Sequence, residues 1–426
     1  MATYSSKKYP SGSVTSATLA DGTVVAVDLA DGAVTSAKLN STVDLSGKTV
    51  TYRSIVAGDI ASNAITSAKM ANSGAELGMR NRIINGAMVI DQRNAGTAVT
   101  INTTSNTYVM DRWRCRGESS DGVYTCQQVS DAPAGFKNSS KITVTTADAS
   151  VDVGKVYGFQ QWIEGFNIAD LDWGTANAKP ITISFWVRSS ITGTFGGGVT
   201  NGSLNRSYPF TYTISAANTW EQKSVTITGD TSGTWASTNT AALRLNYNIG
   251  AGSENIGTAG AWNSDNDFSA TGAVDLINTL NATWFITGVQ LEVGSTATSF
   301  DYRPYGTEFQ LCQRYYEKSY NVDVAPGTNT GAGDSFLPLL YANASVLDYG
   351  GNCYFKVSKR ANPTIAYWKE EGTSNVWSWF TGSSSGTATP VTNRSGTNSF
   401  TIYATGSGFS NTTYIAAGQW TASSEL

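Results

Sequence analysis

The first regular pattern of hydrophobic positions is a ten-residue repeat near the N-terminus. Residues 11–40 divide into the blocks SGSVTSATLA, DGTVVAVDLA and DGAVTSAKLN. A valine and a leucine recur at fixed places in every block, namely Val14, Val24 and Val34, and Leu19, Leu29 and Leu39. A unit of this length holds about one strand and one turn, too little apolar surface to offset its own ordering entropy, so it must stack on further units.

The strand edges of such an array predict association between chains. Asp-Gly pairs at residues 21–22 and 31–32 mark the turns, because glycine tolerates positive φ. Bare strand edges attract other strands, and three chains around one axis would cover every edge. Residues 11–79 are therefore predicted to form a repetitive intertwined shaft of a homotrimer. The alternative is a disordered low-complexity linker, although such a linker has no reason to keep valine and leucine at constant spacing.

From residue 80 onward, short apolar strands alternate with turns rich in Gly, Ser, Thr and Asn. This pattern predicts strands at residues 108–115, 123–129, 141–146, 155–163, 180–188, 210–214, 222–228, 243–248 and 282–293. Many short strands with regular turns indicate two packed antiparallel sheets, so residues 80–304 are predicted to form a jelly-roll β-sandwich. Trp113, Trp162, Trp186 and Trp284 fall inside these strands and are expected in the core.

One segment has a helical period. In residues 305–320, Phe309, Cys312 and Tyr316 recur at i, i+3 and i+7, which aligns them on one stripe of a helix. The stripe would bury against a neighbouring domain or close a three-chain bundle, or the segment is an ordinary connecting helix. Residues 305–334 are interpreted as a helical linker, and residues 335–426 as a separate domain that resembles a β-sandwich. The expected fold class is all-β.

Composition and charge exclude several classes of function. Charged residues make up 14% of the 426 residues, the net charge is −4, and Lys and Arg form no long cluster, so we expect no nucleic-acid partner. No run of about 18 apolar residues occurs, and the N-terminus lacks the apolar segment of a secretory signal, so we expect no membrane insertion. Cysteines occur at positions 115, 126, 312 and 353 without a Cys-x-x-Cys motif, and each is expected to be a buried thiol.

The chain contains no histidine. This removes the usual general base, the usual zinc ligand and every Ser-His-Asp or Cys-His arrangement. The sequence has no phosphate-binding loop and no EF-hand motif, so no spacing identifies a metal site and we expect no cofactor. Calcium bound through Asp and backbone oxygens of a sandwich is the alternative that stays open. A pair of carboxylates, as glycoside hydrolysis uses, is the one catalytic scheme left, and dispersed acidic residues do not indicate it. We therefore expect that the protein is not an enzyme.

Aromatic side chains beside polar loops are the candidate binding residues, because sugar rings stack on exposed aromatic faces. The C-terminal domain has Tyr367, Trp368, Trp377 and Trp379 around the loop at residues 369–375. In a strand over residues 376–380, Trp377 and Trp379 share one face, which is either a binding platform or core.

A second candidate pair, Trp235 and Trp262, lies in Gly/Ser/Thr/Asn-rich loops of the jelly roll. These two tryptophans either contact a carbohydrate or anchor their loops. Arg206 and Tyr208 are near them in sequence only.

Several motifs resemble the receptor-binding tail fibre proteins of tailed bacteriophages. They are NRIINGAMVIDQRN, YVMDRWR, QQWIEGFNIADLDWG, ITISFWVRSS and above all VQLEVGSTATSFDYRPYGTEFQLCQRYYEKSY. The resemblance covers about residues 80–320 and the closing AAGQWTASSEL. It implies a homotrimer, a shaft attached to the tail through its N-terminus, a jelly roll like a carbohydrate-binding module, and a distal receptor-binding tip that touches the host surface. It supplies no catalytic acids.

This resemblance leads to an expected function. Residues 1–10 precede the repeats and are interpreted as a tail-attachment peptide, which binds the phage tail or a separate adaptor protein. The chain would attach the virion to a host surface polysaccharide or lipopolysaccharide by multivalent, non-catalytic binding. It would be a component of the virion tail, made in the host cytoplasm and released by lysis. The alternatives are a tail-associated polysaccharide depolymerase and a purely structural fibre.

Overall fold

The structure, a computed structural model, describes residues 79–426 apart from 103–104, 120, 332–338, 344–345, 349–351, 382–383 and 407–412. The chain divides into two units, Met1–Ala71 and Asn72–Leu426. The predicted attachment peptide at residues 1–10 and the predicted shaft up to residue 78 lie outside the described residues.

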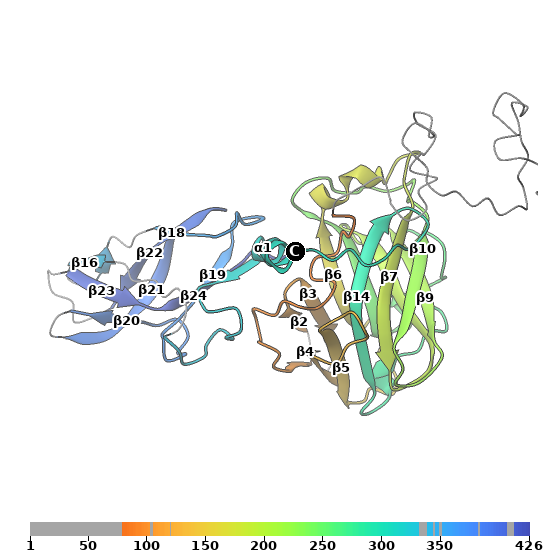
Figure 1. Cartoon of the computed structure of the whole chain (residues 1–426), viewed down its shortest axis with the longest axis horizontal. Coiled ribbons are helices and arrows are strands. Elements are labelled where there is room, and N and C mark those ends of the chain that lie inside the picture. Colours follow the sequence, from red (N-terminus) through yellow and green to blue (C-terminus); the bar gives the residue numbers. More distant parts are fainter. Residues whose placement is uncertain are drawn as a thin grey trace, which may run out of the picture. The chain divides into compact units, whose positions relative to one another are not determined.

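Two six-stranded antiparallel sheets form a β-sandwich (Figure 1). Sheet A contains, in spatial order, β1 (Val99–Ile101), β4 (Val123–Val129), β5 (Ser139–Thr146), β14 (Thr283–Val293), β7 (Ile181–Ser189) and β10 (Glu221–Ile227). Sheet B contains β2 (Ser105–Met110), β3 (Trp113–Gly117), β6 (Val156–Glu164), β11 (Ala241–Ala251), β8 (Gly193–Asn201) and β9 (Ser207–Ile214). The predicted all-β class and the jelly-roll sandwich are confirmed.

Aromatic side chains from both sheets fill the core of the sandwich. Trp113 of sheet B stacks on Phe159 with ring centroids 4.7 Å apart, and Phe159 meets Trp284 of sheet A edge to face at 5.9 Å. Trp113 and Trp284 are fully buried, as predicted, whereas Trp186 is only half-buried. Large apolar rings of this kind dominate the burial term that stabilises a sandwich.

The strand prediction is wrong at three places. The predicted strand at residues 108–115 is a hairpin, because the chain turns at Asp111 and Arg112, where Arg112 has a φ of 68°. Strands β1 and β8 were not predicted. The other sandwich strands lie within a few residues of their predicted positions.

Short elements complete the sandwich. They are the 3-10 helices η4 (Gly165–Asn167), η5 (Ala169–Leu171), η6 (Ser253–Asn255) and η7 (Leu276–Asn278), and the parallel strands β12 (Ile256–Gly257) and β13 (Ser269–Ala270). The segment carrying β12 and β13 packs on the outer face of sheet B, where Asn246 Nδ2 donates to the Phe268 carbonyl at 2.5 Å. Asn248 Nδ2 likewise donates to Asp275 Oδ1 at 2.8 Å.

The predicted linking helix is α1 (Tyr305–Gln313). Its Cys312 is buried with Ile84, Ile90 and Tyr315, so the apolar stripe packs on another part of the same chain. The stripe ends early because Tyr316 begins strand β15. No helix in the described ranges is both long and apolar enough to cross a membrane.

The C-terminal domain is built from two sheets. A seven-stranded sheet contains β17 (Val346–Asp348), β16 (Leu339–Asn343), β23 (Thr413–Ala417), β20 (Trp377–Phe380), β21 (Ser385–Ser395), β22 (Ser399–Thr405) and β18 (Asn352–Tyr354). A three-stranded sheet contains β15 (Tyr316–Lys318), β24 (Gln419–Ser423) and β19 (Thr364–Trp368). A hydrophobic cluster joins side chains of both sheets, which confirms the predicted sandwich-like fold.

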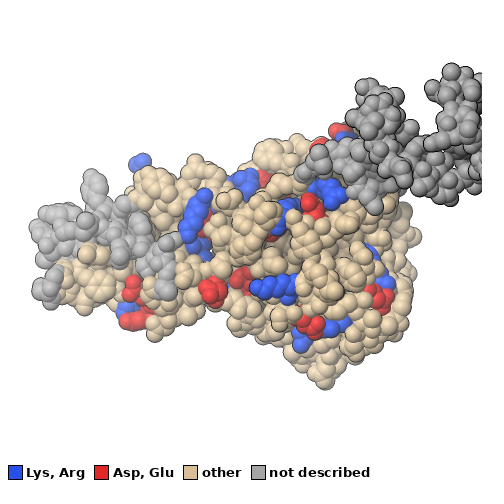
Figure 2. Space-filling view, in the orientation of Figure 1, with Lys and Arg blue, Asp and Glu red and all other residues tan. Residues whose placement is uncertain are grey.

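Buried polar contacts tie the last residues to the jelly roll. Glu425 forms ion pairs with Arg93, at 2.7 Å, and with Arg112. The hydroxyl of Tyr108 donates to the Leu426 carbonyl at 2.7 Å. All four cysteines are buried thiols, as expected. On the face shown in Figure 2, basic and acidic side chains are interspersed among uncharged residues.

Candidate functional site

The predicted aromatic site of the C-terminal domain lies largely in its core. Tyr367, Trp377 and Trp379 are 5%, 0% and 7% exposed. Tyr367 meets Trp377 edge to face, with ring centroids 5.5 Å apart. The face that Trp377 and Trp379 share therefore belongs to the core and is not a binding platform. This corrects the binding interpretation of these three residues, because a buried ring presents no face to a sugar.

Trp368, the fourth member of that predicted site, is half-buried. Its ring packs edge to face on Tyr320 at a centroid distance of 6.3 Å. A binding role for Trp368 stays a prediction.

The structure brings the second predicted pair together. Trp235 and Trp262 lie 5.6 Å apart between ring centroids, and both contact Trp173, at 4.6 and 5.3 Å. Arg206 also joins this tryptophan cluster, since its guanidinium carbon lies 5.9 Å from the Trp262 centroid. Tyr208 packs edge to face on Trp262 at 5.3 Å, so the neighbours in sequence are neighbours in space.

Each indole N–H in the tryptophan cluster has a partner within the protein. Trp173 donates to the Lys179 carbonyl at 2.7 Å, and Trp262 donates to the Thr228 carbonyl at 2.7 Å. Trp235 donates to Asp230, which also forms an ion pair with Arg206. The hydrogen bond between Arg206 and Asp230 raises the pKa of Arg206. These bonds support the loop-anchoring alternative, and ligand contact by Trp235 or Trp262 stays a prediction.

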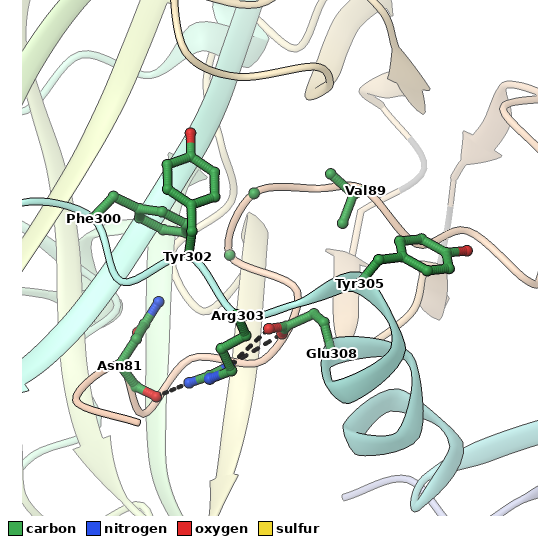
Figure 3. Close-up of a pocket in the computed structure, with 9 residues that line it drawn as sticks. Asn81, Val89, Phe300, Tyr302, Arg303, Tyr305 and Glu308 are labelled. Atoms are coloured by element: carbon green, nitrogen blue, oxygen red, sulfur yellow. Dashed lines mark hydrogen bonds and ion pairs between the residues drawn. The ribbon is translucent and has the colours of Figure 1, made fainter. Parts of the chain in front are cut away.

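A cavity of about 150 Å³ lies where the segment after β14 meets residues 81–89 (Figure 3). Phe300 and Tyr302 lie on one side of this aromatic pocket and Tyr305 on the other. Tyr302 and Tyr305 are 56% and 53% exposed, so their rings are available to a ligand. A cavity of about 150 Å³ holds one six-membered ring.

An ion pair forms the polar side of the aromatic pocket. Arg303 Nη1 donates to Glu308 Oε1 and Oε2 at 3.1 and 2.9 Å. Arg303 also donates to the carbonyls of Asn81 and Ile83, while Glu308 accepts the backbone N–H of Asn85. These contacts hold both charged groups in fixed positions, as recognition of sugar hydroxyls requires.

The aromatic pocket was not predicted from the sequence. Its walls come from residues 81–89 and 300–308, more than 200 residues apart in the chain. The available signal was the motif SFDYRPY, which places three aromatics around a proline between a strand and a helix.

The chemistry of the aromatic pocket favours binding over hydrolysis. Glu308 is the only carboxylate among its nine lining residues, and it is bound to Arg303. Glycoside hydrolysis needs two carboxyl groups, about 5–9.5 Å apart. Within the described part of the chain, no group of three or more Cys, Asp or Glu residues is arranged to hold a metal ion.

Comparison with known proteins gives only distant similarities. No family model and no curated protein matches the chain. Among solved structures, the chain is similar to the enzymatically active domain of tailspike protein 4 from bacteriophage CBA120 (14% identity, TM-score 0.27, 50% of this chain and 22% of that one). It is also similar to a putative sugar binding protein from Bacteroides thetaiotaomicron (12%, 0.31, 50% and 100%).

A third similar structure is a family 11 carbohydrate-binding module from Clostridium thermocellum in complex with a β-1,3-1,4-mixed-linked tetrasaccharide (10% identity, TM-score 0.25, 47% of this chain and 97% of that one). The chain thus spans about a fifth of the tailspike chain and nearly all of the two smaller proteins. At these TM-scores the matches carry no inference about the ligand or activity of this chain.

Proposed function

We propose that the chain is a non-catalytic, glycan-binding fibre protein of a phage tail, which attaches the virion to a host surface polysaccharide or lipopolysaccharide. The aromatic pocket is the observation that carries the binding part of this proposal. Exposed Tyr302 and Tyr305 offer ring faces for stacking, and the fixed Arg303–Glu308 pair offers a donor and an acceptor for hydroxyl groups.

Two features of the chain support a role in binding without turnover. The sequence has no histidine, and the single carboxylate of the aromatic pocket is held by an arginine. One weak sugar site suffices in a multivalent fibre, because tethering raises overall affinity by about 10²-fold or more.

The fibre part of the proposal rests on the sequence. The ten-residue repeat and its bare strand edges favour a homotrimeric shaft, with residues 1–10 held by the tail or an adaptor protein. The motifs at residues 80–320 resemble phage tail fibres, and a virion-tail location follows from that resemblance.

The test combines binding and polymer length in one sample. The full chain is mixed with bacterial envelope polysaccharides and lipopolysaccharides, and binding is followed by calorimetry while chain length is followed by size exclusion. We expect binding with unchanged length, and a loss of binding of about tenfold or more in Tyr305→Ala. Tyr354→Ala, which removes another tyrosine that is 70% exposed, is the matched control and is expected to bind normally.

Three results would overturn parts of this proposal. Shortening of the polymer would identify a depolymerase. Failure to bind any of the glycans or any host cells would identify a structural fibre. Equal binding by Tyr305→Ala and the unchanged chain would remove the aromatic pocket from the function.

A further inference from the structure

The outer face of sheet B, turned away from the core, carries three arginines. In β3 every second residue enters the core, which places Arg114 and Arg116 on the outer face. In β11, Arg244 lies between two core leucines and points the same way. Trp162 of β6 pairs directly with Arg244 in the sheet register. We call these four residues the arginine face.

The charge of Arg244 is poorly compensated. The side chain is fully buried, and its Nη2 donates to Asn266 Oδ1 at 2.7 Å. Its Nε and Nη1 have no hydrogen-bond partner within the residues that the structure describes. Burial and the charges of Arg116 and Arg114 lower the pKa of Arg244. The nearby Glu118 is already paired with Arg116.

The strands on both sides of Arg244 also carry buried polar atoms without a partner among the described residues. Trp162 and Thr200 are its register partners on β6 and β8. In the described part of the chain, Trp162 Nε1 and Thr200 Oγ1 are buried without a hydrogen-bond partner. Native proteins leave few such atoms, because each buried polar group without a partner destabilises the fold. Their position in one row across three strands indicates a missing group that supplies oxygen acceptors.

We propose that the arginine face binds the carboxylate or phosphate group of an acidic glycan. An anionic oxygen would neutralise Arg244 and accept hydrogen bonds from the atoms that lack partners. Half-buried Arg114 and Arg116 form the solvent edge where the anion first makes contact. The Asn266 amide oxygen occupies the place that an anionic oxygen takes on binding.

Two further observations favour an anion-bearing sugar over diffuse attraction of negative charge. The whole chain has a net charge of −4, so the arginine face is a local exception to an acidic molecule. Its arginines flank an indole, with guanidinium carbons 5.9 Å (Arg114) and 5.6 Å (Arg244) from the Trp162 ring centroid. This packing fixes the positions of both cations, as recognition of one charged substituent requires. That the anion belongs to a glycan rests on the proposed function. That the arginine face binds an anion rests on the arginines alone.

The test titrates the full chain with small ligands that differ in one group. Glucuronate and glucose 6-phosphate carry the anion on a sugar, glucose lacks it, and inorganic phosphate lacks the sugar. We expect both acidic sugars to bind more tightly than glucose and inorganic phosphate. Arg114→Gln is expected to weaken acidic-sugar binding about tenfold. Arg394→Gln removes an exposed arginine of the C-terminal domain and is the charge-matched control.

A second variant separates a folding defect from a loss of contact. Arg114→Lys keeps the positive charge and is expected to retain acidic-sugar affinity within a few fold, with an unchanged melting temperature for both variants. Equal weakening by Arg114→Gln and Arg394→Gln, or no binding of any anion, would overturn the proposal. Inorganic phosphate binding as tightly as glucose 6-phosphate would overturn the assignment to a glycan.

The two proposals fail in different ways. If the chain binds glucuronate through Arg114 but no envelope polysaccharide, the proposed function fails and the anion site stands. If polysaccharide binding depends on Tyr305 while no acidic sugar binds, the anion site fails and the proposed function stands.

Discussion

Trp162 and Arg244 face each other across β6 and β11, with the Arg244 guanidinium carbon 5.6 Å from the indole centroid. This contact offsets only part of the cost of burying the charge, because two guanidinium nitrogens have no partner among the described residues. The sandwich therefore carries an energetic cost at this position when no ligand is bound.

Arg244→Met is predicted to stabilise the ligand-free protein. Methionine fills a similar volume without a charge, so we expect the free energy of unfolding at pH 7 to rise by about 1 kcal/mol or more. Urea unfolding of the two proteins measures the difference. Arg394→Met, at an exposed position, should change stability by less than about 0.5 kcal/mol. A large loss of stability in Arg244→Met would show that the arginine is structural.

Asp111 is predicted to make stability depend on pH. Burial raises its pKa to about 6, although Gln92 donates to it through its backbone and side-chain nitrogens at 2.7 and 2.6 Å. Because the folded-state pKa is raised, the contribution of Asp111 is fully present below about pH 4 and is lost as the pH rises through about 6.

The measurement for Asp111 compares unfolding of the unchanged chain and Asp111→Asn. Between pH 4 and pH 7, we expect the stability difference to shift in favour of the variant by up to about 3 kcal/mol. Asp265→Asn, at an exposed loop residue, controls for loss of one carboxylate. Parallel stability curves for Asp111→Asn and the unchanged chain would contradict the prediction.

Lys318 is predicted to stabilise the contact between the C-terminal domain and the jelly roll. Its buried ammonium donates to the carbonyls of Gln92, Val322 and Val324 at 2.6, 3.0 and 2.6 Å. Lys318→Met leaves these carbonyls without that donor, so we expect a loss of about 3 kcal/mol or more in the free energy of unfolding. Thermal and urea unfolding measure it, with Lys137→Met as the exposed control. Wild-type stability in Lys318→Met would show that water replaces the ammonium.

Local pattern predicted much of the fold. Strand β4 coincides with its predicted range, since its apolar and polar residues alternate and turn residues flank it. The hairpin of β2 and β3 was missed because its turn contains Arg112 at positive φ, where glycine or asparagine is the usual signal.

The candidate sites were less predictable because they are formed by distant segments. Alternation alone places Arg114 and Arg116 on one face, but only the strand register brings Arg244 beside Trp162. The burial of Trp377 depends on packing between two sheets, which a single sequence does not specify. The aromatic residues of the sequence therefore indicated side chains able to bind a sugar, but the sequence did not show which of them lie in the core and which on the surface.

Strand β8 was missed because its sequence GTFGGGVTN has a low strand propensity, and its glycines are explained by close packing. A Cβ atom on Gly197 would lie 2.5 Å from a ring carbon of Phe210 and 2.6 Å from the Asn246 carbonyl oxygen. The second neighbour is backbone of the paired strand β11, so it cannot move aside without disturbing the sheet.

Gly197→Ala is therefore predicted to destabilise the sandwich by about 1–3 kcal/mol, as overpacking does in other cores. Gly306→Ala is the matched control, because a Cβ there meets open space within helix α1. That control should be neutral or stabilise by up to about 1 kcal/mol, since alanine favours helix. Urea unfolding of both variants measures the contrast. Equal stability of the two variants would mean that β8 tolerates a side chain at Gly197 and that its glycines have another cause.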